Sequence, residues 1–365
     1  MRLGWEGKLW MAGVGMGLGL IVRDRYHRRR RLESADSLRA KVALVTGGSR
    51  GLGLLLAREL AREGCRVAIC ARDERELERA KFELRRKGAE VVTGVCDVAD
   101  REQIEAFVER IQRTLGPVEV LVNNAGVITV GPVETMTVPD FQDALGTMYW
   151  GTVYSTLAVL PAMLERGAGR IANVTSVGGK VSVPHLVPYC SAKFAALGFS
   201  QGLRTELSGR GITVTTIVPG LMRTGSHVNA LFKGRQQSEY QWFGLAASLP
   251  LLSVPAEKAA RQIVLAIKRG DAEYTVGIPA RLLARFHGLF PSASITLAEL
   301  FARFLPGARE QVVTPRRGVA FERSGESLFW NLLTALGQRA SERLQDHQRP
   351  FAVSNHEERS AKSPI

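Results

Sequence analysis

The sequence contains few cysteines, and none of them forms a closely spaced pair. Four occur in 365 residues, namely Cys65, Cys70, Cys96 and Cys190, without any Cys-x-x-Cys spacing. A framework of structural disulfides is therefore not expected, and no metal site is predicted. The four thiols are interpreted as small buried side chains in a reducing compartment.

Motifs for binding nucleic acids are also missing, although the net charge is +14. There is no helix-turn-helix spacing, no zinc-finger spacing and no RNA-binding aromatic motif. Much of the positive charge lies near the ends of the chain. Residues 1–41 hold ten Lys/Arg against four Asp/Glu, and residues 281–365 hold twelve against eight. A basic leader beside an apolar run favours a membrane surface, so no nucleic-acid partner is expected.

The uncharged run near the N-terminus is short for a membrane span. Leu9–Val22 has 14 residues, which as a helix cover about 21 Å of a hydrocarbon core about 30 Å thick. Starting at Trp5, with Lys8 snorkelling, the helix reaches about 27 Å. Six arginines follow between residues 23 and 31, which orients the rest of the chain toward the cytoplasm. A membrane anchor within residues 1–40 is favoured, while a soluble leader and a cleaved signal peptide stay open.

From residue 41 onward, short apolar runs alternate with segments of helical periodicity. This alternation predicts an α/β fold: a single doubly wound Rossmann-type parallel sheet with helices on both faces. Residues 41–280 contain no internal repeat and no domain break, and we interpret them as the dinucleotide-binding catalytic domain. The strands are expected at 41–46, 65–71, 90–96, 118–122, 170–175, 212–218 and 272–276, and the helices at 54–63, 74–87, 101–115, 140–166, 187–208 and 255–269.

Three segments do not follow this alternation. Gly225–Ser253 is long and carries Trp242 and Phe243; such an excursion either covers a ligand crevice or is an ordinary surface insertion. Residues 281–339 are interpreted as an amphipathic helical extension, in which Ala280–Leu305 forms one or two helices. These helices can pack on the core, on a partner subunit or on a membrane. Residues 340–365 are polar and predict a disordered tail.

The segment Thr46–Gly53 joins the first predicted strand to the first helix. Its glycines follow the spacing G-x-x-x-G-x-G, a variant of the dinucleotide-binding fingerprint. Glycine at these positions allows a tight turn and lets the backbone approach a diphosphate at the positive end of the following helix. The three glycines are Gly47, Gly51 and Gly53.

The end of the second predicted strand favours NADP over NAD. An NAD-selecting site places a carboxylate there to bind the ribose hydroxyls, whereas this strand ends with Cys70, Ala71 and Arg72. Arg50 of the glycine loop can approach the same corner. Two guanidinium groups suit a 2′-phosphate. The alternative is that Arg72 pairs with the neighbouring Asp73 at the surface.

Polar side chains follow the third and fourth predicted strands. Asp97 can accept a hydrogen bond from the adenine amino group, or it can cap a turn. The segment Asn123–Gly126 places two amides at the carboxyl edge of the sheet, where they can brace the neighbouring loops and the cofactor. An Asn- and Gly-rich turn without further function is the alternative.

The most specific constellation is Tyr189-x-x-x-Lys193, with Ser176 thirteen residues before the tyrosine. Residues i and i+4 share a helix face, so the ammonium group is expected near the phenol. We expect this cation to lower the pKa of Tyr189 from its usual value of about 10. Ser176, at the end of strand 170–175, can hydrogen-bond the substrate oxygen. The set predicts proton transfer by Tyr189.

In combination, these residues resemble the short-chain dehydrogenase/reductase family over residues 41–280. The resemblance implies that Ser176 positions a carbonyl group and that Tyr189 transfers the proton. It implies that Lys193 binds the nicotinamide ribose and tunes Tyr189. The implied cofactor contacts are Gly47, Ser49, Gly51, Leu52 and Gly53 at the diphosphate loop, Asp97 and Val98 at the adenine, Asn124 in the loop structure, and Pro219, Gly220 and Thr224 at the nicotinamide carboxamide.

One position departs from the family pattern. Alignment on Gly151 puts Met148 where the family carries an Asn that supports a water-linked proton relay, and a thioether cannot donate a hydrogen bond. Part of that relay runs through the backbone carbonyl, which any side chain preserves. The substitution leaves two functions open. The favoured one is an NADP-dependent oxidoreductase, and the alternative is a catalytically weak or inactive NADP-binding sensor or scaffold.

The expected substrate is a small carbonyl compound or alcohol. The apolar residues of 225–253 favour a lipophilic one. We expect a membrane-associated homo-oligomer whose catalytic domain faces the cytoplasm.

Overall fold

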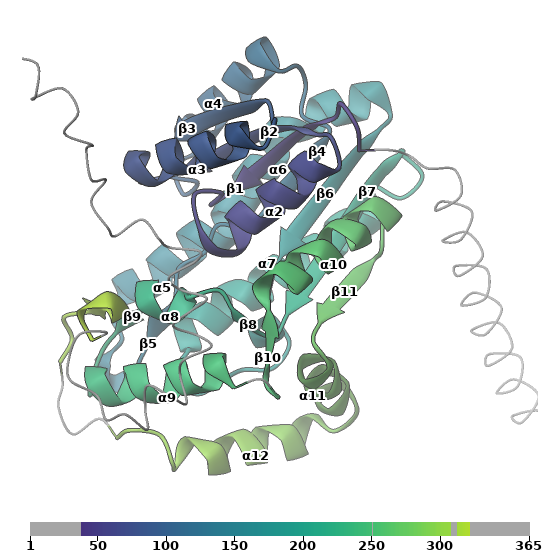
Figure 1. Cartoon of the computed structure of the whole chain (residues 1–365). Helices are drawn as coiled ribbons and strands as arrows, with labels where there is room; N and C mark the ends of the chain where they lie inside the picture. Colours follow the sequence, from purple (N-terminus) through teal and green to yellow (C-terminus); the bar gives the residue numbers. More distant parts are fainter. Residues whose placement is uncertain (1–37, 250, 308–311, 322–365) are drawn as a thin grey trace, which may run out of the picture.

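The central element of the computed structural model is a parallel sheet of seven strands in the order β11-β7-β6-β4-β1-β2-β3 (Figure 1). The structure describes residues 38–249, 251–307 and 312–321. The doubly wound parallel α/β fold predicted from the sequence is confirmed. The strands are β1 (Val42–Thr46), β2 (Arg66–Ala71), β3 (Val91–Val95), β4 (Val120–Asn123), β6 (Gly169–Val174), β7 (Ile212–Pro219) and β11 (Glu273–Val276).

Helices cover both faces of this sheet, and β1 shows why the strands are apolar throughout. Successive side chains of a strand point to opposite faces: Ala43 and Val45 pack into one hydrophobic core, whereas Val42 and Leu44 pack into the other. The first core also contains α2 (Gly51–Arg62), α3 (Glu74–Arg86) and α10 (Ala256–Arg269); the second is covered by α4 (Arg101–Thr114), α6 (Gly151–Arg166) and α7 (Val187–Glu206).

The helix expected over 140–166 is divided. Helix α5 (Val138–Leu145) is separated from α6 by a π-helical turn, Gly146–Trp150. This single wider turn carries Met148 into the interior, where its side chain is only 1% exposed. A π-turn inside a helix is often found at a functional site.

Residues 225–253 form a small lobe at the carboxyl edge of the sheet. It consists of α8 (Ser226–Asn229), β9 (Leu231–Phe232) and α9 (Gln236–Ser248), which pack around the aromatic rings of Phe232, Tyr240 and Phe243. Strand β9 pairs with β5 (Thr129–Val130) and β12 (Arg316–Arg317), while β8 (Leu221–Arg223) pairs with β10 (Ser253–Pro255). The segment is therefore built onto the loop that follows β4.

Two helices follow β11, the last strand of the seven-stranded sheet, where one or two were expected over Ala280–Leu305, and the first begins two residues before that range. They are α11 (Ile278–Leu289) and α12 (Pro291–Ala302), and both lie at the lower end of the molecule in Figure 1. Among the residues described, no helix has the length and apolar character needed to cross a membrane. Residues 1–37 of the predicted anchor and the predicted tail, 340–365, lie outside the described part of the chain.

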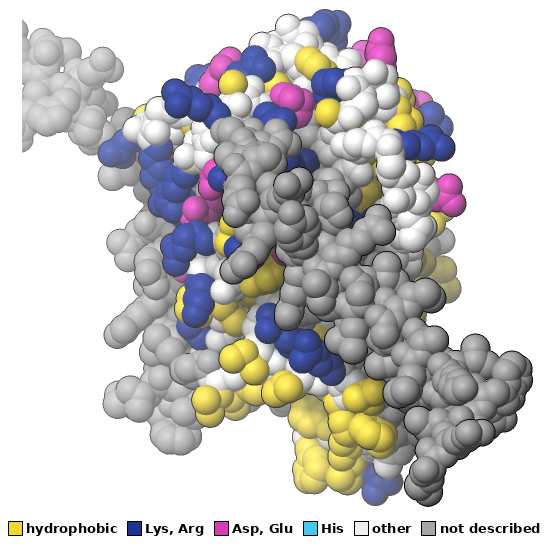
Figure 2. Space-filling model, turned by 90° about the vertical axis from the view of Figure 1, so that its right-hand side faces the viewer, with side chains coloured by type: hydrophobic (Ala, Val, Ile, Leu, Met, Phe, Trp, Pro, Cys, Tyr) yellow, Lys and Arg dark blue, Asp and Glu magenta, His cyan; other side chains and the backbone are white. Residues whose placement is uncertain are grey.

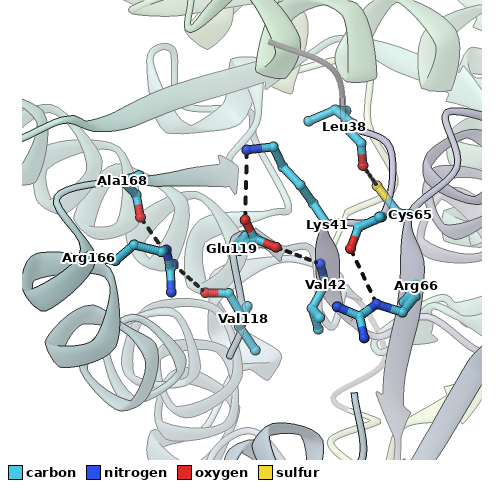
Figure 3. A network of polar contacts seen from close by, with 10 residues as sticks. Leu38, Lys41, Val42, Cys65, Arg66, Val118, Glu119, Arg166 and Ala168 are labelled. Carbon is cyan, nitrogen blue, oxygen red and sulfur yellow. Dashed lines mark hydrogen bonds and ion pairs between the residues drawn. The ribbon is translucent and has the colours of Figure 1, made fainter. Parts of the chain in front are cut away.

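A polar network joins β1, β2 and β4 at the amino edge of the sheet (Figure 3). The Glu119 carboxylate accepts a hydrogen bond from the Val42 amide at 3.3 Å and lies 3.8 Å from the Lys41 ammonium. The Cys65 thiol donates to the Leu38 carbonyl at 3.2 Å. These contacts supply partners for main-chain groups at the strand starts. All four cysteines are free and buried.

Close packing of the glycine loop is testable at Gly53. A Cβ there would lie 2.0 Å from the Gly47 carbonyl oxygen and 2.6 Å from the Asn124 side-chain nitrogen. Because this clash is with the main chain, we expect Gly53→Ala to lower the free energy of unfolding by about 1–3 kcal/mol. Gly198→Ala in α7 is the matched control, since its Cβ meets nothing within 4 Å and should stabilise by about 0.5–1 kcal/mol. Urea denaturation measures both, and stabilisation by both variants would contradict the close packing.

Candidate functional site

The candidate site lies at the carboxyl ends of β1, β4 and β6. The chain proceeds from β1 outward to β2 and β3, and then returns to place β4 on the other side of β1. Strands β1 and β4 therefore flank the point where the winding direction reverses. In doubly wound sheets, this switch point is where ligands bind.

The glycine loop is held in place by Asn124. Its side-chain amide donates to the carbonyl oxygens of Thr46 at 3.0 Å and Gly47 at 3.3 Å. The Thr46 hydroxyl in turn accepts from the Asn124 main-chain amide at 2.9 Å. Gly47 and Gly51 have φ angles of +63° and +54°, a region that glycine adopts without strain.

The start of α2 has the features of a diphosphate site. The first N–H groups of a helix have no acceptor within the helix, and no side chain of the described residues caps α2. A Cβ built at Gly51 would meet only the Thr224 carbonyl oxygen, at 4.0 Å. A helix start without a side-chain cap, beside an uncrowded glycine, fits a diphosphate bound to main-chain amides. Leu52 lies in the first turn of the same helix.

A carboxylate occupies the corner expected to select NADP. Glu76 accepts a hydrogen bond from the Ser49 hydroxyl at 2.8 Å and forms an ion pair with Arg50 at 2.6 Å. The sequence analysis placed Arg50 and Arg72 at this corner but did not anticipate this carboxylate. Glu76 belongs to the first turn of α3, which the fold places beside the glycine loop although 26 residues separate it from Arg50.

The other two acidic residues at this corner have local partners. Asp73 caps α3 by accepting from the Glu76 amide at 2.9 Å, so no ion pair with Arg72 is found there. Arg72 lies 3.8 Å from the Asp97 carboxylate instead. Asp97 also accepts from the Ala99 amide at 3.0 Å, which is the turn-capping interaction. Val98 is buried against α6.

Ser176, Tyr189 and Lys193 come together between β6 and α7. The Ser176 hydroxyl follows β6, hydrogen-bonds the Tyr189 hydroxyl and accepts from the Gly178 amide at 3.0 Å. The Lys193 ammonium lies 5.8 Å from the centre of the Tyr189 ring and donates to the Val174 carbonyl at 2.8 Å. The fold thus juxtaposes a phenol, a hydroxyl and a cation.

Burial controls the titration of this group. It raises the pKa of Tyr189 to about 12, against the opposing effect of the Ser176 hydrogen bond, and it lowers the pKa of Lys193 to about 8. The expected fall in the pKa of Tyr189 is therefore not found. Loss of solvent penalises the phenolate, and the Lys193 ammonium is directed toward a carbonyl oxygen. At neutral pH, Tyr189 is a neutral hydrogen-bond donor.

A ladder of hydrogen-bonded, buried polar side chains connects α7 to the sheet. Asn123 donates to Asn173 at 2.9 Å, Asn173 donates to Ser200 at 3.0 Å, and Ser200 shares a hydrogen bond of 2.7 Å with Thr216. The ladder joins β4, β6, α7 and β7. The two amides therefore act on opposite sides of the strand end. The Asn123 amide links the sheet to α7, and the Asn124 amide holds the glycine loop.

Met148 contributes no polar side chain to the site. It packs with Ala144, Ala192 and part of Tyr189. Its carbonyl oxygen accepts from the Thr152 hydroxyl at 2.8 Å. The thioether thus lies next to the candidate acid, in the position where the family pattern has an amide.

Three residues that the sequence analysis did not connect form a hydrogen-bonded cluster near Tyr189: His185, Glu239 and Trp242. Glu239 of α9 is fully buried; its carboxylate lies 2.9 Å from the His185 ring nitrogen and accepts from the Trp242 indole at 2.6 Å. His185 has a φ of +64° and lies four residues before Tyr189. Only the aromatic character of Trp242 hinted at this contact, because Glu239 resembles an ordinary surface residue of a helix.

The nicotinamide segment expected at Pro219–Gly220 lies at the end of β7: Pro219 is its last residue and Gly220 follows it. The Gly220 amide donates to the Val276 carbonyl at 3.1 Å, and a Cβ at Gly220 would lie 2.7 Å from the Ala280 Cβ. Helix α11 therefore packs directly on this segment. Thr224 is buried a few residues further on and faces the glycine loop through its carbonyl oxygen.

Comparison with known proteins gives a consistent result. The profile of the short chain dehydrogenase family matches residues 41–232. A putative ketoacyl reductase from Streptomyces coelicolor is 43% identical over 187 residues, which cover 51% of this chain and 72% of that protein. A dehydrogenase/reductase SDR family protein 7-like from Drosophila melanogaster is 30% identical over 296 residues, which cover 79% of this chain and 89% of that protein.

A solved structure of an actinorhodin polyketide ketoreductase variant with NADPH shares the fold. It is 36% identical, with a TM-score of 0.59, over 65% of this chain and 95% of that chain. Together with the geometry at the carboxyl edge, these matches show that the chain belongs to the short-chain dehydrogenase/reductase family, whose enzymes act on carbonyl or alcohol substrates with a nicotinamide dinucleotide.

Proposed function

We propose that the protein is an NADP-dependent carbonyl reductase in which Tyr189 donates the proton. The observation that carries this proposal is the placement of the Tyr189 hydroxyl beside Ser176 and the buried Lys193; burial, which raises the pKa of Tyr189, favours its protonated form. A proton donor near neutral pH suits reduction of a carbonyl better than oxidation of an alcohol, because oxidation needs the phenolate as base.

The residues divide the chemistry as follows. Bound NADPH supplies the hydride. The Ser176 hydroxyl orients the substrate oxygen, and the Tyr189 hydroxyl delivers a proton to that same atom as negative charge develops on it. The Lys193 ammonium binds the ribose and favours the phenolate left after proton transfer. Main-chain amides at Gly51, Leu52 and Gly53 would hold the diphosphate of the bound cofactor.

For cofactor choice, we propose that Arg50 and Arg72 bind the 2′-phosphate. Arg72 is well exposed, and its contact with Asp97 is long at 3.8 Å, so it is available to a phosphate. Arg50 must exchange Glu76 for the phosphate. The related polyketide ketoreductase whose structure contains NADPH supports this choice. Asp97 and Val98 would border the adenine, and Pro219, Gly220 and Thr224 the carboxamide.

We propose a lipophilic substrate. The lobe of residues 225–253 places Phe243 and part of Trp242 in the same hydrophobic core as part of Tyr189 and its neighbours Leu186 and Cys190. The buried Glu239 contact with His185 fixes α9 against the segment just before Tyr189. An apolar cover of this kind favours substrates that bury hydrocarbon next to the reacting carbonyl.

We further propose membrane association through residues 1–40, with the catalytic domain facing the cytoplasm, and a homo-oligomer. The exposed side chains of Trp150, Leu157 and Leu164 recur every seven residues along α6 and the turn before it. Such a stripe suits packing against a second copy.

The second candidate function is an NADP-binding sensor with little turnover. Met148 favours it, because the buried thioether provides no hydrogen bond beside Tyr189. Cofactor binding without reduction would distinguish this function from the enzyme.

Replacing Tyr189 with Phe tests the reaction. Phe removes the donor but keeps the ring, so NADPH-dependent reduction of a panel of aliphatic and aromatic ketones and aldehydes should fall by about 10²–10⁴-fold. NADPH binding, measured by fluorescence, should change little. Equal rates for the two proteins would rule out Tyr189 as the acid, and negligible rates for both would favour the sensor.

Cofactor selectivity is tested at Glu76 and Arg72. Arg72→Ala should weaken NADPH binding by about tenfold or more while leaving NADH nearly unchanged, since a charged hydrogen bond is worth about 1.5–3 kcal/mol. Glu76→Gln should act in the opposite direction, because it releases Arg50 for the phosphate. Dissociation constants for both cofactors provide the measurement. Parallel changes for NADPH and NADH in both variants would contradict the assignment.

The depressed pKa of Lys193 has a signature in stability. Between pH 8 and 10.5 the unfolded chain holds a proton that the native state has released, so this group makes stability rise with pH. Below pH 8 its burial costs about 3 kcal/mol. The free energy of unfolding of Lys193→Met, minus that of the parent, should therefore be larger at pH 7 than at pH 10. We expect this difference to fall by about 2–3 kcal/mol between the two pH values, because only the parent gains stability over that range. Denaturation across this range measures it, and a difference independent of pH would refute the shift.

A further inference from the structure

Helix α11 has its large apolar residues on the side that faces away from the protein. Ile278, Leu282, Phe286 and Leu289 recur at helical spacing on one side, and their exposed fractions are 69%, 60%, 37% and 73%. A helix that serves only the fold directs such a stripe toward the core. Here the orientation is reversed.

The inner side of the hairpin is made of small and polar residues. Ala280 is buried against Gly220, and the His287 ring hydrogen-bonds the Ser294 hydroxyl at 2.6 Å, which joins α11 to α12. Ala280 and Ser294 are the buried residues of the two helices. These contacts set the rotation of the hairpin, so the outward stripe does not result from loose packing.

Helix α12 continues the apolar surface. Leu297, Leu300, Phe301 and Phe304 lie on one side of this helix and its last turn, and each of them is exposed. Figure 2 shows hydrophobic side chains gathered at the lower end of the molecule, with basic side chains beside them. We call the eight residues of the two stripes the hairpin surface. A contiguous surface of this kind marks an interaction site.

The charges around the hairpin surface are almost all positive. Arg281 and Arg285 precede and follow Leu282 on α11, one helical turn apart, and Arg303 precedes Phe304. All three side chains are exposed. Glu299 is the single acidic residue between 278 and 307. An apolar stripe flanked by arginines is the pattern of helices that lie in the plane of a lipid interface.

We propose that the hairpin surface docks on a membrane containing anionic phospholipids. The apolar stripes enter the acyl-chain boundary, and Arg281, Arg285 and Arg303 contact the lipid phosphates. Charge complementarity favours lipid over a second copy of the chain, because a twofold interface through this surface brings the same arginines of both copies together. This inference is independent of the proposed reaction and of any contact made by residues 1–40.

Docking in this way orients the site. Because Ala280 packs on Gly220, α11 joins the lipid-facing stripe directly to the segment proposed for the nicotinamide. The carboxyl edge of the sheet then lies toward the bilayer, and the amino edge lies away from it.

A local fluorescent probe tests the proposal in the full-length protein. The four native cysteines are buried, so Leu289→Cys and Phe304→Cys can each be labelled with an environment-sensitive dye. Phe82→Cys on α3, also exposed, is the control at the other end of the molecule. With vesicles of phosphatidylcholine and phosphatidylserine, the labels at 289 and 304 should shift to shorter wavelength, and the label at 82 should not.

Two further comparisons vary the charge of the protein and the lipid composition of the vesicles. Arg281→Gln and Arg285→Gln should each raise the anionic lipid needed for a half-maximal shift about fivefold, and phosphatidylcholine alone should give a weaker shift. No shift at 289 and 304 on anionic vesicles would overturn the proposal. A shift already present without vesicles would overturn it as well, since the chain itself or a second copy would then cover the surface. Reductase activity of the labelled proteins, assayed separately, reports on the proposed reaction.

Discussion

Two consecutive asparagines at the end of β4 determine the arrangement of the site. Asn124 holds the glycine loop through the Thr46 and Gly47 carbonyls, and Asn123 begins the buried ladder that ends at Thr216. Side chains at adjacent positions of a strand point to opposite faces, so one strand end can fix both the diphosphate loop and the helix that carries Tyr189. Buried amide N–H groups are costly unless paired, and the pairing of the two side-chain nitrogens makes their relative placement specific.

Desolvation then gives the site its chemical character. The same burial raises the pKa of Tyr189 and lowers that of Lys193, which keeps the phenol protonated and leaves the ammonium only modestly favoured at neutral pH. The Ser176 hydrogen bond opposes this effect on the phenol, and the Lys193 ammonium donates to the Val174 carbonyl. A carbonyl group bound here would meet a protonated phenol that is hydrogen-bonded to Ser176, in surroundings that disfavour the phenolate.

The sequence was sufficient for the fold because its signals are local and periodic. The apolar runs that end at Thr46 and Val122 predict buried parallel strands, and the nearness of Tyr189 to Lys193 follows from their i, i+4 spacing on a helix. Glu76 and the ladder beyond Asn123 escaped prediction because they depend on contacts between elements distant in sequence. The direction of the Tyr189 pKa shift was predicted wrongly for a related reason. The spacing reveals a nearby cation, but the extent of burial depends on how the lobe packs.

The rotation of α11 shows the same limit and has a larger consequence. Its sequence predicts an amphipathic helix, and periodicity alone leaves the core, a partner and a membrane equally open. The contact between Ala280 and Gly220 excludes the core, since it turns the small residues inward and leaves Leu282 and Leu289 exposed; the neighbouring arginines are the basis for proposing a membrane. A glycine that would be assigned to the cofactor site on family grounds therefore has a second role. Its missing side chain lets the hairpin approach the sheet closely, which couples the orientation of an outer surface to the geometry of the reaction site.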